Sequence, residues 1–176
     1  MKFRETKLAG VFVINIEPLK DKRGFFARSW CQKEFEAHGL NAELVQCNIS
    51  YNKERGTLRG MHFQTPPHEE AKLVRCVRGA IYDVIVDLRP DSPTYLKWQG
   101  LELSSTNRLA LYIPEGFAHG FLTLTDDAEV FYQMSSWFVP DSTAGIRWDD
   151  PAIAIDWPTQ PQCISKKDQG YPDFAA

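Results

Sequence analysis

Two histidines stand in segments that suit a ligand cavity. His62 lies among small and apolar residues in Gly-Met-His62-Phe, as expected for a strand that points an imidazole into a lined cavity. His119 has a similar setting in Pro114-Glu-Gly-Phe-Ala-His119-Gly-Phe. A single histidine is more often an ordinary core or surface residue. The recurrence of this setting instead favours two histidines that converge from two strands, which would suit general acid–base chemistry.

Other side chains would complete such a site. Tyr132 lies in a strand-like run, Asp168 lies in a polar tail, and Arg23, Arg59 and Lys72 carry fixed positive charge. Each has an ordinary interpretation taken alone, since strand tyrosines pack with a satisfied hydroxyl and turn aspartates are solvated. Taken together, they describe a cavity with a base, an orienting carboxylate, a phenol and three cations.

A metal centre is the alternative that these histidines raise. His62, His119, His68, Glu69 and Glu70 suggest a metal site of the cupin kind. Such sites usually begin with two histidines spaced H-x-H, but the matching triplet here is His-Phe-Gln. Glutamine is a poor ligand for zinc or iron. We therefore expect no metal and no other cofactor, and a metal-dependent cupin enzyme built on His62, His68, Glu70 and His119 stays as the alternative.

The elements that must position these residues are mostly short strands. Apolar and β-branched runs recur with Gly, Pro or Asp between them, which is typical of a sandwich or barrel and not of a βαβ protein. We predict strands at 8–16, 25–30, 44–51, 59–64, 72–77, 80–88, 96–103, 110–113, 120–125 and 129–135. A helix is expected at 32–38, closed by Gly39, and a helical turn at 164–168.

This pattern predicts an all-β fold, a double-stranded β-helix jelly roll of the cupin type with a few short helices. The mouth of such a roll is lined by alternate residues of several strands. The tail after residue 149 has no linker before it. We therefore expect residues 1–176 to form one domain.

Composition excludes several classes of function. The chain has 176 residues, 43% of them hydrophobic and 24% charged, as in ordinary globular proteins. A net charge of -3 gives nucleic-acid binding no electrostatic support. The four cysteines are scattered, and we expect Cys47 and Cys76 to be buried free thiols. No signal-peptide-like run or membrane-spanning run is visible, so a cytoplasmic location without membrane association is expected.

The ordered motifs of the chain resemble those of the dTDP-4-dehydrorhamnose 3,5-epimerases, metal-free cupin-type enzymes of deoxysugar biosynthesis. The resemblance runs from about residue 10 to 158, and more weakly through Asp168. Its motifs are Asp21-x-Arg-Gly-Phe-Phe26, Gln46-x-Asn48, Leu58-Arg-Gly-x-His-Phe-Gln64, Lys72-Leu-Val-Arg75, Asp87-Leu-Arg, Ile113-Pro-Glu-Gly-Phe-Ala-His-Gly-Phe121, Tyr132 and Gly145-Ile-Arg-Trp-Asp-Asp-Pro151. So many motifs in order make a chance match untenable.

The resemblance implies epimerisation of a nucleotide-linked 4-keto-6-deoxy sugar at C3 and C5. The C4 ketone acidifies both protons, so removal from one face and return to the other needs no redox cofactor. By resemblance His62 is the base, Asp168 holds its tautomer, Lys72 faces the enolate and Tyr132 returns a proton. His119 matches a supporting histidine close to the sugar.

The family also implies how the nucleotide is bound. Arg23 and Arg59 match its pyrophosphate contacts, because the arginine fork suits phosphate oxygens. Phe26 resembles a ring that stacks on thymine, and Gln46 and Asn48 match polar residues of the cleft. The family is a homodimer in which the N-terminal segment crosses over, so Arg23 and Phe26 are expected to serve the neighbouring subunit's site.

Two positions depart from the family pattern. Arg28 replaces a glutamate two residues after Gly-Phe-Phe, which leaves the nucleobase open. Phe138 replaces a tyrosine six residues after Tyr132, inside the expected substrate site. The loss of that hydroxyl makes a mono-epimerase, acting at C3 or C5 only, the alternative activity. A non-catalytic sugar-nucleotide binding module is a further alternative.

Overall fold

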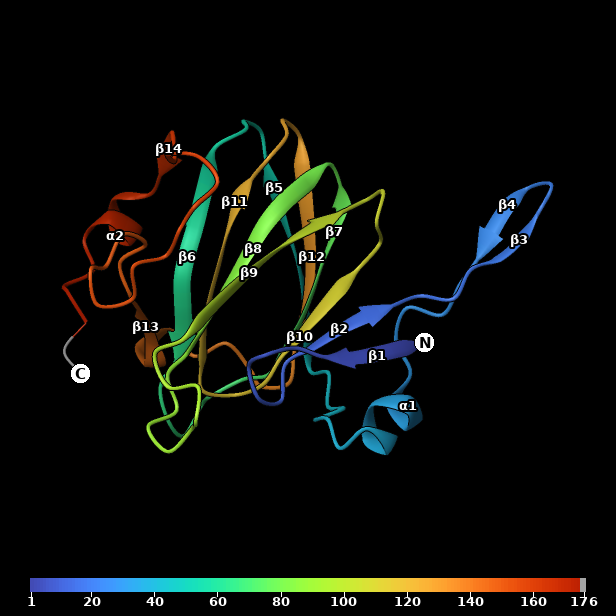
Figure 1. The fold of residues 1–176 in the computed structure, drawn as a ribbon, viewed down its shortest axis with the longest axis horizontal. Coiled ribbons are helices and arrows are strands. Elements are labelled where there is room, and N and C mark those ends of the chain that lie inside the picture. Colours follow the sequence, from blue (N-terminus) through green and yellow to red (C-terminus); the bar gives the residue numbers. More distant parts are fainter. Residues whose placement is uncertain (175–176) are drawn as a thin grey trace.

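A computed structural model describes residues 1–174 of the chain. Two six-stranded sheets face each other and form a jelly roll (Figure 1). The first sheet runs in the order β1 (Lys2–Glu5), β2 (Phe12–Asn15), β10 (Ala110–Ile113), β7 (Lys72–Arg78), β12 (Ala128–Met134) and β5 (Gln46–Asn52). The second runs β13 (Thr143–Gly145), β6 (Thr57–Gln64), β11 (Phe117–Thr123), β8 (Ala80–Asp87) and β9 (Trp98–Ser104), and β14 (Cys163–Ile164) also pairs with β6. The predicted jelly roll is confirmed.

The two sheets are held together by an apolar core between them. Successive side chains of a strand point to opposite faces, so alternate residues from both sheets meet inside. Val74 and Val130 of the first sheet join Ile81 and Ile85 of the second in one buried cluster. Tyr132 packs at its margin. The interior therefore passes from an apolar core to a polar cavity along the same strands.

Both outer faces are covered by short segments. Helix α1 (Gln32–Ala37) buries Phe35 against Leu73 and Tyr112 on the outside of the first sheet. The C-terminal segment places Ile146 and Ile153 against the outside of the second sheet, where they bury Met61 of β6. Because Met61 faces outward, its neighbour His62 faces inward. The covering segment thus helps to fix which side chains of β6 reach the interior.

The N-terminal third differs most from the prediction. The helix predicted at 32–38 is confirmed, and Gly39 follows it with φ +69°. The strand predicted at 8–16 begins only at Phe12, because a turn at Gly10, with φ +82°, joins β1 to β2. The strand predicted at 25–30 is present only at Phe25 and Phe26, and its extension to residue 30 is wrong. These two residues belong to β4 (Gly24–Phe26), which forms with β3 (Leu19–Asp21) a hairpin that projects from the roll (Figure 1).

The strands after residue 43 lie close to their predicted positions. β10 coincides with the predicted range 110–113, and β11 starts earlier than predicted, so that His119 lies within the strand. The tail holds three elements that periodicity did not indicate, namely β13, β14 and a 3-10 turn at Pro140–Ser142. The helical turn predicted at 164–168 is present as α2 (Lys166–Gln169). These tail elements are too short for a periodic pattern to register.

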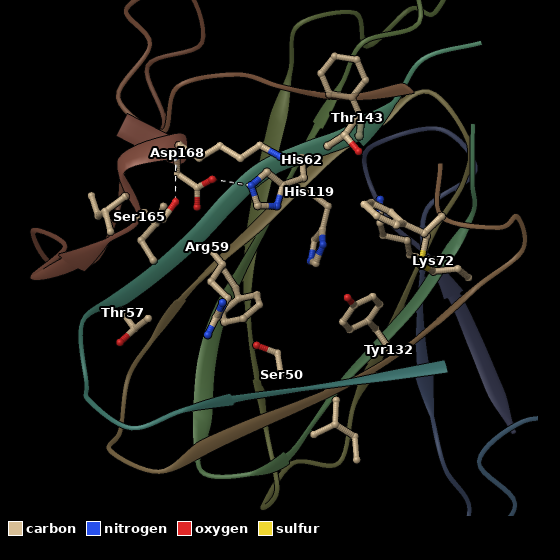
Figure 2. Close-up of a pocket in the computed structure, with 18 of the residues that line it drawn as sticks. Ser50, Thr57, Arg59, His62, Lys72, His119, Tyr132, Thr143, Ser165 and Asp168 are labelled. Atoms are coloured by element: carbon tan, nitrogen blue, oxygen red, sulfur yellow. Dashed lines mark hydrogen bonds and ion pairs between the residues drawn. The ribbon is translucent and has the colours of Figure 1, made fainter. Parts of the chain in front are cut away.

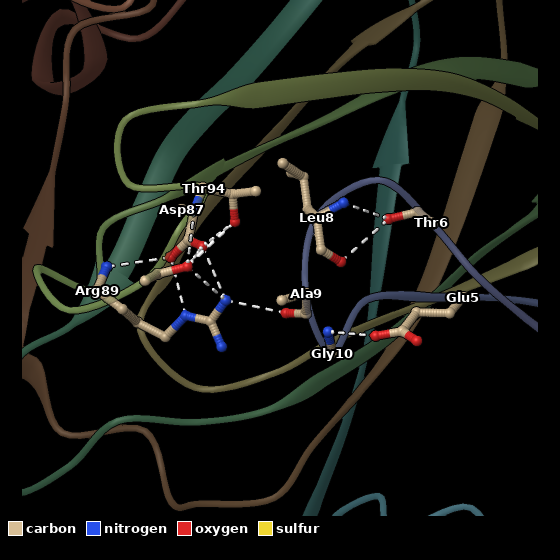
Figure 3. Close-up of polar contacts among 9 residues, drawn as sticks. Glu5, Thr6, Leu8, Ala9, Gly10, Asp87, Arg89 and Thr94 are labelled. Atoms are coloured by element: carbon tan, nitrogen blue, oxygen red, sulfur yellow. Dashed lines mark hydrogen bonds and ion pairs between the residues drawn. The ribbon is translucent and has the colours of Figure 1, made fainter.

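A buried carboxylate ties the β8–β9 loop to the β1–β2 turn (Figure 3). Asp87 accepts hydrogen bonds from Arg89 (2.7 Å), Ser92 (2.5 Å) and Thr94 (2.6 Å), and Arg89 also donates to the carbonyl of Ala9 (2.9 Å). Burial alone would raise the pKa of Asp87, but these donors outweigh it and lower the pKa to about 2. The carboxylate therefore stays ionised and keeps both turns in place.

One of the two cysteine predictions is wrong. Cys76 is buried, and burial raises the pKa of its thiol to about 11. Cys47 is exposed instead, because alternation along the edge strand β5 turns Gln46 and Asn48 toward the roll and Cys47 away from it.

Within residues 1–174, no helix has the length and apolar character needed to cross a membrane.

Candidate active site

A cavity of about 730 Å³ lies between the two sheets and is closed on one side by the C-terminal segment. This volume is within the range of pockets that bind small molecules. Seven of the predicted site residues line it, namely His62, Asp168, Lys72, Tyr132, Arg59, His119 and Phe138 (Figure 2). They come from β6, β7, β11, β12, the segment after β12 and α2, so residues far apart in the sequence meet in one place.

A local irregularity of β6 brings Arg59 and His62 to the same cavity. Residues three apart in a regular strand point to opposite faces. Here the pairing of β6 with β11 shifts register between His119 and Phe121. At that point Gly60 has φ +137°, and a Cβ on it would lie 2.5 Å from the Cα of Gly120. The close approach therefore requires a glycine at position 60 and lets both side chains enter the cavity.

His62 and Asp168 form a hydrogen-bonded pair on the cavity wall (Figure 2). The distance from His62 Nε2 to Asp168 Oδ1 is 2.7 Å, and the Asp168 residue is only 4% exposed. Ser165 caps α2 by accepting a hydrogen bond from the Asp168 amide (3.0 Å), which fixes the backbone there. Burial alone would raise the pKa of Asp168, but the hydrogen bond and charge of His62 outweigh it and lower the pKa. An ionised Asp168 thus accepts a hydrogen bond from Nε2–H of His62, which leaves Nδ1 as the unprotonated nitrogen.

A second histidine pair lies beside the first. His119 is the direct cross-strand neighbour of His62, and its Nε2 lies 2.8 Å from Oδ1 of Asp83. Asp83 is completely buried, and its Oδ2 has no hydrogen-bond partner among the residues described. A buried carboxylate is stabilised by a charged or strongly donating neighbour. Asp83 therefore fixes the orientation of the His119 ring.

Lys72 and Tyr132 enter the cavity from the opposite sheet (Figure 2). Lys72 is almost buried and forms an ion pair with Glu70. Burial raises the pKa of Tyr132, the charge of Arg59 lowers it and the charge of Glu70 raises it, with a net rise. The phenol therefore keeps its proton through the neutral range. The cavity thus has an imidazole on one wall and a protonated phenol with an ammonium on the other.

The predicted nucleotide contacts fall into two groups. Arg59 is held by Asn52, which accepts from Nε at 2.6 Å. Gln46 accepts a hydrogen bond from the backbone N–H of Phe138 (3.1 Å), and Asn48 lies beside Gln46 (3.4 Å). Gln46 and Asn48 therefore lie next to the lining residue Phe138, although they are not themselves in the cavity wall.

Arg23 and Phe26 form the second group, and they do not reach this cavity. Both lie on the projecting β3–β4 hairpin, where Phe26 is 74% exposed. Arg23 pairs with Asp21 of its own hairpin at 2.6 Å. Arg28, which departs from the family pattern, is paired with Glu34 of α1 at 2.9 Å. The charge of Arg28 is thus matched within the N-terminal segment.

The sequence patterns missed Tyr171 and Asp83 of this site and indicated Glu70 only as a metal ligand. Tyr171 packs edge-on against His62, with 6.3 Å between ring centroids, and it covers Gly145, where any side chain would collide with its ring. Asp83 and Glu70 each hold a cavity residue. The position of Asp83 on one face of a strand was a usable signal. The tail around Tyr171 carries no periodic signal.

The residues of the metal alternative do not assemble. Glu70 is engaged by Lys72, and His68 is not among the residues that line the cavity with His62 and His119. In the part of the chain that the structure covers, no three His, Cys, Asp or Glu side chains are grouped so as to hold a metal ion.

Comparison with known proteins shows the family to which the chain belongs. The family model for dTDP-4-dehydrorhamnose 3,5-epimerase matches residues 5–176. The chain belongs to this family. The dTDP-4-dehydrorhamnose 3,5-epimerase of Shigella flexneri is 44% identical over 169 residues, covering 96% of this chain and 93% of the relative. The family therefore accounts for nearly the whole chain.

Two further family members bear on substrate and outcome. The crystal structure of the epimerase from Bacillus anthracis, with TDP and PPi bound, superposes with a TM-score of 0.95 at 42% identity and covers 98% of this chain and 99% of that one. A dTDP-4-dehydrorhamnose 3-epimerase of Streptomyces niveus is 42% identical over 170 residues, covering 96% of this chain and 82% of the relative. The family thus includes members named for one carbon as well as for two.

Proposed function

We propose that the protein epimerises a dTDP-linked 4-keto-6-deoxy sugar at C3 and C5, converting dTDP-4-dehydro-6-deoxyglucose to dTDP-4-dehydrorhamnose. The observation that carries this proposal is the placement of the His62–Asp168 pair and of Tyr132 on opposite sheets, facing one cavity. Inversion needs a proton acceptor on one face of the sugar and a donor on the other. The membership of the family and the names of its relatives support the same substrate.

His62 acts as the base in this proposal. Its Nε2–H donates a hydrogen bond to the ionised Asp168 and keeps its proton, so the unprotonated Nδ1 accepts the proton from C3 or C5 of the sugar. The electron pair of the broken C–H bond moves to the C4 oxygen as an enolate. Lys72 stabilises that oxygen by a charge-assisted hydrogen bond. Tyr132 then donates its phenolic proton to the other face of the same carbon.

The nucleotide is held by the cationic side of the cavity. Arg59 and Lys167 both line it, and their charges suit the two phosphates of a dTDP group. A second copy of the chain supplies further contacts through the β3–β4 hairpin. The exposure of Phe26 and the projection of the hairpin from the roll support this role (Figure 1). We infer a homodimer in which Arg23 and Phe26 complete the partner's nucleotide site.

Hybrid dimers test this shared site. Co-expression of His62→Ala chains with Arg23→Ala chains creates one complete site in each mixed dimer. Random pairing then restores about a quarter of wild-type activity, because half of the dimers are mixed and each has one intact site. The two variants expressed separately serve as controls. Co-expressed chains with no more activity than the separate variants would contradict the shared site.

Proton exchange tests the reaction itself. The protein is incubated with dTDP-4-dehydro-6-deoxyglucose in deuterated water, and the sugar is followed by proton NMR. We expect the C3 and C5 signals to disappear and the epimerised product to form. Exchange and inversion at one carbon only would establish the mono-epimerase alternative, which Phe138 favours because it brings no hydroxyl to the cavity. Absence of exchange at both carbons would exclude an epimerase of this substrate.

A further inference from the structure

Glu70, the carboxylate of a buried ion pair behind the cavity wall, has no place in the reaction described above. Glu70 and Lys72 are two residues apart, and their side chains are only 3% and 10% exposed. Lys72 lines the cavity, whereas Glu70 does not. Glu70 can therefore affect the sugar only through the groups that it holds.

The backbone around this pair is fixed from the neighbouring strand. The amide of Ala71, between the two charged residues, donates to the hydroxyl of Ser135 at 2.8 Å, and the amide of Ser135 donates to the carbonyl of Ala71 at 3.0 Å. These two bonds hold the corner against the end of β12. The carboxylate of Glu70 then accepts a hydrogen bond from Lys72 Nζ. Backbone and side chain together restrict where the ammonium points.

Stability does not account for Glu70. Its second oxygen, Oε2, is buried and has no hydrogen-bond partner within residues 1–174. A buried carboxylate with half of its acceptor capacity unused is costly, and apolar replacements of buried ion pairs are often neutral or stabilising. A pair retained at such a cost next to a reactive cavity points to a role in catalysis.

We propose that Glu70 is a positioning residue, which orients the Lys72 ammonium so that its remaining N–H groups face the C4 oxygen of the sugar. This inference rests on the proposed function. An ammonium has three donors, and Glu70 occupies one of them, so the other two have a defined direction. The charge of Glu70 also reaches Tyr132 and helps to raise the pKa of its phenol. One buried carboxylate thus acts on both groups of the wall opposite His62.

The variant Glu70→Gln removes the charge and keeps an acceptor in place. We expect kcat to fall about 10- to 100-fold, because the Lys72 ammonium would no longer be held toward the C4 oxygen. KM and dTDP affinity should stay within about threefold of wild type, because the nucleotide contacts are unchanged. Glu69→Gln is the matched control, because Glu69 has the same charge one residue away and is not among the residues of the cavity wall. It should leave kcat within twofold of wild type. Glu70→Asp keeps the charge, so its kcat should fall less than that of Glu70→Gln. This variant provides the test if Glu70→Gln does not fold.

The decisive measurement makes the Glu70→Gln change in an enzyme that lacks the Lys72 ammonium. In a Lys72→Met background, the further change Glu70→Gln should alter kcat by less than twofold, because nothing remains to be oriented. An equal loss in both backgrounds would assign Glu70 a general structural role and overturn the proposal. A Glu70→Gln enzyme with wild-type kcat would also overturn it. Wild-type protein without proton exchange would instead refute the proposed function, so the two failures are distinct.

Discussion

His62→Ala should abolish proton exchange at both C3 and C5 while the protein stays folded. A positioned general base raises the rate of proton transfer about 10²- to 10⁴-fold, so the exchange rate at each carbon should fall by a factor in this range. The fold should survive because the His62 side chain is 39% exposed and belongs to none of the buried apolar clusters. Deuterium exchange followed by proton NMR measures the loss, and circular dichroism with dTDP binding measures the retained fold.

Two companion variants make this result specific. Asp168→Asn keeps the shape of the pair, but its amide can donate to Nε2, which would place the imidazole proton on Nδ1 and remove the base. A loss of about 10²- to 10⁴-fold is expected there as well. His38→Ala is the matched control and should leave exchange unchanged. His38 follows the last residue of α1, stacks on Phe3 and is not among the residues that line the cavity. His62→Ala enzyme that exchanges protons at a near-normal rate would rule out His62 as the base.

Residues on regular strands were predictable from the sequence. The alternation of β12 places Tyr132 on an inward face, and the apolar runs around Lys72 and His119 mark strands that the structure contains. Gly39 marked the end of helix α1 in the sequence, and its φ of +69° in the structure agrees with that position. The resemblance to a known family then grouped these residues into one site. Periodicity carries such information because each of these side chains follows the local geometry of its own strand.

Residues placed by irregular or long-range features were not predictable in this way. Arg59 and His62 share a cavity because of a register shift opposite His119, which no two-residue alternation can express. Tyr171 reaches His62 from a tail without periodicity, and the Glu70–Lys72 pair depends on a corner fixed by β12. The hairpin that bears Phe26 projects from the roll. In the proposed dimer the hairpin acts on the site of a second chain, and sequence periodicity cannot describe such a contact.

Tyr132→Phe should separate exchange from inversion. His62 can still remove a proton from the first carbon, exchange it with solvent while protonated, and return deuterium to the same face. Exchange with retention therefore continues. Delivery to the opposite face needs the Tyr132 hydroxyl, so inversion should fall about 10²- to 10⁴-fold. Proton NMR in deuterated water records both quantities in one sample, as loss of the C–H signal and as appearance of the epimerised sugar.

The ratio of inversion to exchange is the informative quantity, because it removes any difference in substrate affinity between variants. Tyr82→Phe is the matched control, since Tyr82 packs against Trp157 on the outer face of the second sheet and should leave the ratio unchanged. An unchanged ratio in Tyr132→Phe would mean that another group returns the proton. His62→Ala lowers exchange and inversion together, whereas Tyr132→Phe lowers inversion alone. This difference follows directly from a base on one sheet and a donor on the other.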